Sequence, residues 1–270
     1  MRRLQKYRSI FRIRFSAGIQ YRAAALAGIA TQYAWGFLNI MLYIAFYRAD
    51  AHAFPMTLQA VITYMWLRQG FLTLFETWSV EQDIYTAVTS GNIAYELIRP
   101  IGLYQMWYVR ILSARVAKVV LRAIPLLLVA ALLPAPYGIV PPPSPAAFMG
   151  FLCTLFLGTL VTCAYIMLIY IVTFFTMQPQ GVRILFDTVA EFLGGSFIPI
   201  PFFPAAFAQI LEWLPFASMS NVPYRVYSGD IAGAAVWQAM GLQVFWLLAL
   251  LVCGHFFLTR ALRRAVIQGG

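Results

Sequence analysis

One apolar passage, residues 191–229, contains too many helix-breaking residues to form a continuous helix. The breaks fall at Gly194, Gly195, Pro199, Pro201, Pro204, Pro215 and Pro223. Because each proline removes a backbone donor and clashes with the preceding turn, we expect a helix end, a bend, a short second helix and a return. In lipid, irregular backbone is tolerated only where protein buries it or where it lines a cavity. The passage therefore predicts a re-entrant helical hairpin over residues 199–229, beside a transport path.

The composition places the chain in a membrane. Of its 270 residues, 62% are hydrophobic and only 10% are charged, and the mean hydropathy is +0.77. A soluble domain carries about 25% charged residues. We therefore expect an all-α integral membrane protein with one transmembrane domain over residues 1–270. Windows of about 20 apolar residues predict six transmembrane helices at 23–47, 58–79, 103–133, 146–176, 182–198 and 234–258.

The basic residues predict the orientation, because Lys and Arg concentrate on the cytoplasmic side of membrane proteins. They flank the first and last spans at Arg2, Arg3, Lys6, Arg8, Arg12, Arg14, Arg22, Arg260, Arg263 and Arg264. Both termini are therefore predicted to be cytoplasmic. The net charge of +10 then follows mostly from topology. These cations favour anionic lipid as a partner, and we expect no binding of nucleic acid.

The first 22 residues have the pattern of a helix lying on the membrane surface. Leu4, Tyr7, Phe11, Phe15 and Ile19 recur every three or four positions, and basic side chains fill much of the rest. This pattern predicts an N-terminal interfacial helix over residues 1–22. The alternative is a solvated basic flank.

The segment 80–102, between the second and third spans, is the longest polar insertion on the predicted cytoplasmic side. Ser90, Gly91 and Asn92 predict a turn, and Ile93, Leu97 and Ile98 predict a short amphipathic helix that ends before Pro100. An apolar helix face in the cytoplasm calls for a protein partner. The alternative is a loop that folds back on the bundle.

Charges also occur within the predicted spans, where each costs at least about 2.5 kcal/mol on insertion scales. They are Arg68, Glu76, Arg115, Lys118, Arg122, Arg183, Asp187 and Glu191. Arg115, Lys118 and Arg122 share one face of the third span, so we expect them to pair with Asp187, Glu191 or Glu76 inside the bundle. The alternative is that they line a path for an anionic or amphiphilic cargo.

The chain lacks the residue patterns of a catalytic or metal site. Cys153, Cys163 and Cys253 are too far apart for a CxxC pair and are expected to be small buried residues. His52 and His255 are isolated in the sequence. No GxxxxGK[ST] motif occurs, so the sequence predicts no P-loop in this chain.

Four segments carry a resemblance to a known family: GNIAYELIRP, LGGSFIPIPFFP, ILEWLPF and VPYRVYSG. With the basic start and the six expected spans, they resemble the permease subunits of type-2 ATP-binding-cassette exporters, in the branch that exports drugs, viologens or antibiotics from bacteria. The resemblance covers nearly the whole chain. It implies an elbow helix at the N-terminus and multi-pass insertion in the bacterial cytoplasmic (inner) membrane. It further implies a dimer formed with a second permease subunit, either identical or similar to this one.

The resemblance also implies that separate ATPase subunits bind ATP and Mg, so that this chain is not an enzyme and holds no cofactor. A coupling helix would dock on the ATPase through Ser90, Gly91, Asn92, Ile93, Glu96, Leu97, Ile98, Arg99 and Pro100. External re-entrant helices would form an outer gate from Gly194, Gly195, Phe197, Pro199, Pro201, Phe202, Phe203, Pro204, Pro215 and Phe216. Phe197, Phe202 and Phe203 are the expected plug.

Two other classes stay open at the level of sequence. A proton-coupled secondary transporter could use Asp187 and Glu191 as a proton site and would need no partner. A membrane-embedded enzyme would need a polar catalytic cluster, which the sequence does not provide.

Overall fold

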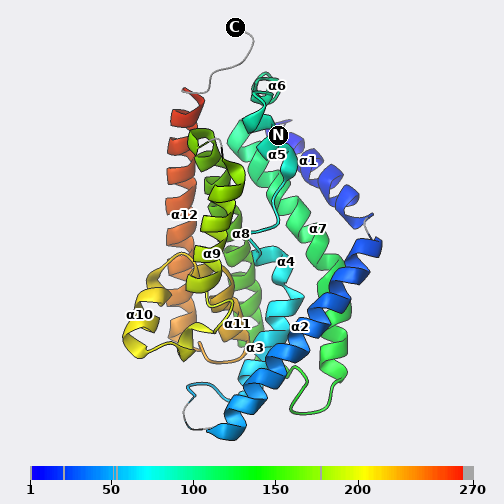
Figure 1. The fold of residues 1–270 in the computed structure, drawn as a ribbon, viewed down its shortest axis with the longest axis vertical. Coiled ribbons are helices and arrows are strands. Elements are labelled where there is room, and N and C mark those ends of the chain that lie inside the picture. Colours follow the sequence, from blue (N-terminus) through cyan, green and yellow to red (C-terminus); the bar gives the residue numbers. More distant parts are fainter. Residues whose placement is uncertain (1, 21, 51, 53, 177, 264–270) are drawn as a thin grey trace.

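The structure, a computed structural model, describes residues 2–20, 22–50, 52, 54–176 and 178–263. Within these residues every regular element is a helix (Figure 1), as expected from the composition. The five longest helices are α1 (Arg2–Ile19), α2 (Arg22–Ala49), α7 (Leu103–Leu132), α8 (Pro145–Thr176) and α12 (Ala234–Leu262). The shorter ones are α3 (Leu58–Gly70), α4 (Leu72–Phe75), α5 (Gln82–Thr89), α6 (Ile93–Leu97), α9 (Pro179–Leu193), α10 (Ala205–Trp213) and α11 (Val222–Tyr227).

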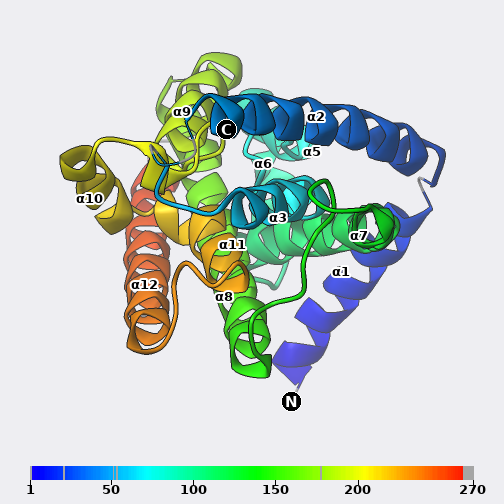
Figure 2. The ribbon, with the colours of Figure 1, turned by 90° about the horizontal axis from the view of Figure 1, so that it is seen from below.

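Helix α8 forms the centre of the bundle. It is apolar on all sides, and a helix with this pattern is stable only when neighbours cover it. Helices α12, α11, α9 and α7 pack against it. Trp107 of α7 and Tyr170 of α8 are among the largest fully buried side chains. Figure 2 shows α1 on one side of this centre and α10 and α12 on the other.

In the described part of the chain, three helical segments are both long enough and apolar enough to cross a membrane: Ala25–Ala49, Pro145–Thr176 and Ala234–Leu262. Helix α7 has 30 residues, but Arg110, Arg115, Lys118 and Arg122 give it more charge than an ordinary span carries. The expected spans 23–47, 103–133, 146–176 and 234–258 agree with α2, α7, α8 and α12 to within a few residues. The predicted count of six spans is not confirmed.

The expected second span, 58–79, is wrong as a single helix. Helix α3 ends at Gly70, Phe71 leaves helical geometry (φ −100°, ψ 10°), and α4 ends at Phe75. Arg115 of α7 donates to the carbonyl oxygens of Thr73 (3.2 Å) and Leu74 (2.9 Å), near the end of α4. A buried guanidinium thus satisfies carbonyls that a continuing helix would have used.

The expected fifth span, 182–198, is also wrong in its bounds. Helix α9 ends at Leu193, and its 15 residues measure roughly 22 Å, less than the hydrocarbon core of about 30 Å. The backbone N–H of Ser196 donates to the carbonyl of Glu191 (3.1 Å), while Gly195 adopts φ 75°. This Schellman-type ending explains the Gly194–Gly195 pair, because the left-handed position strains any residue that carries a Cβ.

Helix α1 confirms the helical prediction for the N-terminal stretch, although it ends at Ile19. Tyr7, Phe11 and Phe15 are half-buried and Arg8 and Arg12 are exposed, as the pattern predicts. Helix α1 packs along α7. The prediction that α1 lies on the membrane surface is not tested by these contacts and stays a prediction.

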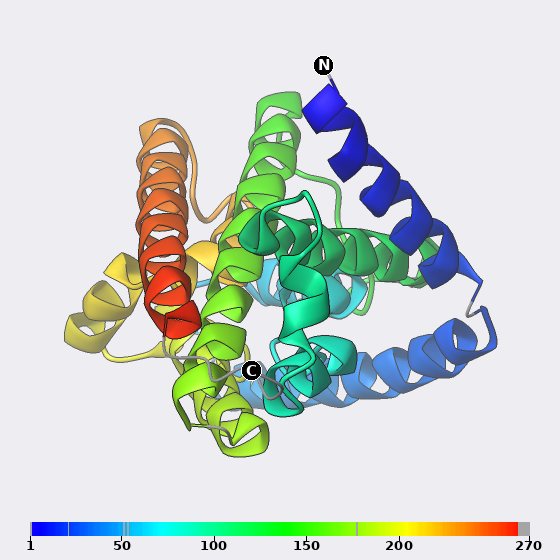
Figure 3. The ribbon, with the colours of Figure 1, turned by 90° about the horizontal axis from the view of Figure 1, so that it is seen from above.

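The described ends of the chain lie at the same end of the molecule along its longest axis (Figure 1). Helix α1, the last turns of α12 and the pair α5–α6 occupy the same end of the molecule, and the connections after α2 and α7 occupy the other (Figure 1). Seen from above (Figure 3), α5 and α6 lie over the bundle. This arrangement agrees with termini on one side of a membrane, but which side is cytoplasmic stays a prediction. Arg264, counted among the basic flanks, lies outside the described residues.

The cysteines correct one smaller expectation. Cys163 is buried in α8, whereas Cys153 and Cys253 are exposed. Their spans present these two side chains to the outside of the bundle, which the spacing along the sequence did not reveal.

Candidate functional site

The segment between α4 and α7 folds into two short helices joined by a tight turn. Helix α5 ends at Thr89, and the Ser90 hydroxyl donates to the Thr86 carbonyl (2.6 Å). Gly91 adopts φ 75°, in the left-handed region that favours glycine. The turn and the short helix α6 that follows it confirm the local prediction. Helix α5 was not predicted, because its polar composition is also typical of a loop.

The tip of this segment exposes large apolar side chains. Tyr95 is 70% exposed, Ile98 is 79% exposed and Leu97 is 39% exposed. The prediction that Ile93 shares this face is wrong, because Ile93 is buried in the main hydrophobic core. The exposed surface, defined by Tyr95, Leu97 and Ile98, is named the apolar tip below.

Arg110 of α7 anchors the segment beneath the apolar tip. Its guanidinium lies 3.1 Å from Glu96 of α6, 3.4 Å from Asp83 of α5 and 4.0 Å from Glu81. The Arg110 side chain is 6% exposed and that of Glu96 is 13% exposed. A buried guanidinium needs such partners, so α5 and α6 are both held to the first turns of α7.

Aromatic packing reinforces this anchor. The indole N–H of Trp107 donates to the second carboxylate oxygen of Glu96. Tyr85 of α5 meets Tyr170 of α8 edge to face, with ring centroids 4.9 Å apart, and the Tyr170 hydroxyl accepts from the backbone N–H of Glu81 (2.6 Å). Burial raises the pKa of Tyr85 to about 12, because the phenolate would lose its hydration. The hydroxyl therefore stays neutral.

Helix α1 contributes a further layer of contacts. Arg14 lies 3.9 Å from Glu81 and 3.8 Å from Asp83, and the Lys6 ammonium donates to the carbonyl of Pro100 (3.2 Å). Arg99, which the sequence placed in this site, lies beside the same helix at a small hollow lined by Arg14 and Arg110. The segment thus contacts α1, α7 and α8 at once.

A second polar cluster lies where α4 ends. Lys118 donates to the Ser79 hydroxyl (2.7 Å) and lies 3.9 Å from Glu76, so this cation has one of its expected acidic partners. Arg115 has backbone carbonyl partners instead of an acid. The two cations join α7 to the chain leaving α4, which leads directly into α5.

The other intramembrane charges are dispersed. Asp187 accepts from the Thr77 hydroxyl, and Arg183 donates to the carbonyl of Trp78 (3.4 Å). Among the described residues, Arg68, Arg122 and Glu191 form no ion pair. The guanidinium of Arg122 lies against Gly28 of α2, where an added Cβ would be 2.7 Å from its Cζ. The expected pairing of Arg122 with Asp187, Glu191 or Glu76 is therefore absent from the described part of the chain.

The passage 194–227 has the bends and short helices that its prolines predict. A 3₁₀ turn (Ile200–Phe202) follows Pro199 and contains Pro201, Pro204 caps α10, and Pro215 and Phe216 lead into a π-helical turn (Ala217–Asn221) before α11. Buried polar contacts fix this arrangement. The Asn221 amide donates to the Tyr64 hydroxyl (3.1 Å), and the Gln243 amide donates to the carbonyls of Thr154 and Ser218 (2.9 Å each).

The three expected plug residues do not gather in one place. Phe202 packs between Tyr43 of α2 and Phe54, with ring centroids 5.5 Å from each. Phe203 contacts Phe192 and Phe207, whereas Phe197 is 61% exposed. The passage, called the hairpin below, thus consists of bends and short helices fastened to their neighbours. Its re-entrant path and its role as an outer gate stay predictions.

Reasoning from sequence missed four residues of this site: Tyr95 of the apolar tip, Arg110, Trp107 and Tyr85. For Arg110, a signal was present: the segment carries three acids, Glu81, Asp83 and Glu96, and Arg110 is the first cation in the helix that follows. Trp107 and Tyr85 gave no such signal, because aromatic residues near span ends are common as interface anchors.

The family comparison agrees with this architecture. A family model described as an ABC-2 family transporter protein matches residues 33–269. That stretch includes α5, α6, the apolar tip and the hairpin. No curated protein matches the chain.

Proposed function

The chain belongs to the ABC-2 family of transporter proteins, whose members act as membrane permeases with an ABC ATPase as partner, and we propose that it works as an ATP-driven exporter. The family membership makes it a transporter subunit without a catalytic site of its own. ATP and Mg would bind to the separate ATPase. Export, the cargo and the composition of the complex are parts of the proposal.

One observation carries the proposal: the apolar tip is exposed while the helices that bear it are fixed from below. Tyr95 and Ile98 are more than two-thirds exposed, although α5 and α6 are held by ion pairs to the buried guanidinium of Arg110. A contact surface of this kind stabilises a complex when a partner covers it. The rigid mounting lets a displacement of the tip reach the rest of the molecule.

The contacts of the segment supply the route for that displacement. Arg110 and Trp107 connect α6 to α7, Tyr170 connects the start of α5 to α8, and Arg14 connects α5 to α1. Closure of two ATPases on nucleotide would move the tip, and these buried contacts would move α7 and α8 with it. The free energy of the change resides in the ATPase.

The cargo we propose is a drug-like, antibiotic, amphiphilic or peptide molecule. It would pass between this permease and a second copy or a similar subunit in the bacterial cytoplasmic membrane, with both termini and the apolar tip in the cytoplasm. Helix α2 presents exposed apolar side chains such as Trp35, Leu38 and Met41. In a bilayer this face would meet lipid or the second permease.

Site-specific photo-crosslinking tests the ATPase contact. A benzophenone amino acid replaces Tyr95 in cells that express the whole transporter. The matched control replaces Leu132, which is 84% exposed and is the last residue of α7, the helix whose C-terminal end lies at the opposite end of the molecule from α6 (Figure 1). The expected product joins position 95, and not position 132, to a protein with a P-loop.

The test has two results that would overturn the proposal. One is the absence of any nucleotide-hydrolysing partner at position 95, with the variant still active in export. The other is proton-driven transport by the purified chain alone, which would favour a secondary transporter.

A further inference from the structure

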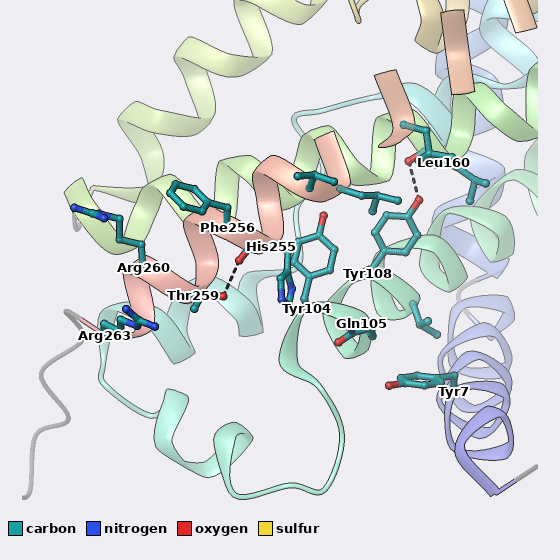
Figure 4. A pocket seen from close by; sticks show the side chains of 14 residues that line it. Tyr7, Tyr104, Gln105, Tyr108, Leu160, His255, Phe256, Thr259, Arg260 and Arg263 are labelled. Carbon is teal, nitrogen blue, oxygen red and sulfur yellow. Dashed lines mark hydrogen bonds between the residues drawn. The ribbon is translucent and has the colours of Figure 1, made fainter. Parts of the chain in front are cut away.

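A large groove opens on the flank of the bundle between α7 and α12 (Figure 4). Its volume is about 1300 Å³, and α1 and α8 complete its walls. The apolar walls include Leu247, Leu251 and Val252 of α12 and Tyr108 of α7.

The charge of the groove is one-sided. Arg260 and Arg263 lie at one end of it, and none of the fourteen lining residues is acidic. Both arginines are exposed and form no ion pair among the described residues. His255 lies nearer to this end than Tyr108 does, whereas the hydroxyl-bearing Tyr7 lies on the opposite side of the groove (Figure 4). An occupant with an anionic head and an apolar body would match this distribution.

The length of the groove fits one leaflet of a bilayer. From Leu247 to Arg260 the groove follows α12 over thirteen residue-to-residue steps, which span about 20 Å at about 1.5 Å per residue. A bilayer is about 40–45 Å thick with its headgroups, so one leaflet measures about the same as the groove. The cationic end then lies at headgroup level and the aliphatic end at the bilayer midplane.

We propose that this groove is a binding site for one anionic phospholipid of the leaflet on the side of the termini. The headgroup phosphate contacts Arg260 and Arg263, and an acyl chain lies along Leu251 and Val252 between α7 and α12. Basic pockets between transmembrane helices select anionic headgroups in this way. The site rests on the membrane orientation in the proposed function and is independent of the ATPase contact.

A bound lipid would join parts of the molecule that otherwise touch little. Tyr7 lies on α1, Tyr104 on α7 and Val252 on α12. Tyr104 already packs tightly on α12, since a Cβ added to Gly254 would lie 2.7 Å from the Tyr104 hydroxyl oxygen. The lipid would fill the remaining space beside this contact and connect α1 to α12.

Native mass spectrometry of the purified full chain in detergent tests the proposal. The protein is titrated with phosphatidylglycerol and, separately, with phosphatidylcholine of the same chain length. We expect one phosphatidylglycerol adduct at low lipid excess and no comparable phosphatidylcholine adduct. Each arginine near the headgroup contributes about 1 kcal/mol to the free energy of lipid binding, which equals about fivefold in affinity. The double variant Arg260→Ala with Arg263→Ala should therefore bind phosphatidylglycerol about 25-fold more weakly.

Matched variants separate the groove from general attraction to lipid. Val252→Trp fills the groove from an exposed position (69%) and should remove the adduct, whereas Val244→Trp, 41% exposed on the same helix and not lining the groove, should keep it. Arg48→Ala removes an exposed cation at the other end of the molecule and should leave binding unchanged.

Three results would overturn the lipid site. The first is equal affinity for the two lipids, and the second is equal lipid binding by the double arginine variant and the wild type. The third is disulfide cross-linking between two copies of Val252→Cys, which would assign the groove to a protein interface. Crosslinking at Tyr95 is a separate readout. A failure of the lipid site therefore leaves the proposed function standing, and a failure of the ATPase contact at Tyr95 leaves the lipid site standing.

Discussion

Replacing Arg110 with methionine should release the α5–α6 segment from the bundle without unfolding the protein. Methionine preserves much of the volume of the side chain and removes its charge. The carboxylate of Glu96, only 13% exposed, would then keep a single described partner, the Trp107 indole. A buried charge that loses its partner is strongly destabilising.

The size of the effect follows from how the partners are exposed. Breaking a fully buried ion pair costs about 3–5 kcal/mol, but Asp83 is 71% exposed and Glu81 is 24% exposed, so water compensates part of the loss. We expect about 2 kcal/mol. This value corresponds to roughly a 30-fold increase in the equilibrium constant for local opening of the segment.

Amide hydrogen exchange measures this opening directly, because exchange from a locally opening unit scales with its opening constant. In Arg110→Met, the amides of α5 and α6 should exchange about 30-fold faster, including those of Ser90 and Ile98, which are bonded within the segment. Amides of α8 should keep their rates. In Arg110→Lys, the exchange rates of α5 and α6 should lie between those of wild type and Arg110→Met, because lysine retains the charge but lacks the planar guanidinium group.

Arg225→Met is the matched control. Arg225 is also poorly exposed, at 13%, and pairs with Glu212 and Asp230, but these residues lie in the hairpin region. Its loss should leave exchange in α5 and α6 unchanged. If the segment in Arg110→Met exchanged within threefold of wild type, or if α8 accelerated equally, the ionic anchor would not be what holds the segment.

Three further variants test separate parts of the structure. Gly91→Val places a β-branched residue at φ 75°, which should distort the turn at a cost of about 1–2 kcal/mol. ATP hydrolysis by the reconstituted complex should continue while cargo export falls. Normal export would contradict the coupling role of the turn. Gly158→Ala puts a Cβ 2.2 Å from the Met219 carbonyl oxygen, whereas nothing lies within 4 Å of the Cβ in the control variant Gly241→Ala. Thermal unfolding should therefore show that Gly158→Ala lowers the stability of the protein by about 1–3 kcal/mol and that Gly241→Ala does not. Gln243→Leu removes two buried donations to backbone carbonyls and should cost about 1–3 kcal/mol; an unchanged melting temperature would show that these bonds do not fasten the hairpin.

The sequence by itself determined the features that depend on local backbone chemistry. Prolines 199, 201, 204 and 215 fall at the turns and helix ends of the hairpin, because proline is strongly disfavoured inside helices. Pro125 is an exception, since it lies inside α7. The turn at Gly91 and the helix end at Gly194–Gly195 follow from the freedom of glycine at positive φ. The helical class and the membrane follow from composition alone.

Only the tertiary structure decided which charges meet. Arg115, Lys118 and Arg122 share one face of α7, yet each has a different kind of neighbour. Arg115 contacts backbone carbonyls, Lys118 contacts Glu76, and Arg122 lies against Gly28. Spacing along one helix fixes a common face but not the element opposite it. The same holds for the break at Phe71 in the expected second span, which local sequence does not require and the Arg115 guanidinium supports.

The anchor of the candidate site and the lateral groove could also be found only from the folded structure, and not from the sequence. Arg110 lies 14 residues from Glu96 and 27 from Asp83 in the sequence, and the groove draws its walls from α1, α7, α8 and α12. Local sequence sets where a helix begins, ends and turns, because those steps depend on neighbouring residues. Which side chains become partners depends on the packing of helices far apart along the chain, and only the folded molecule specifies it.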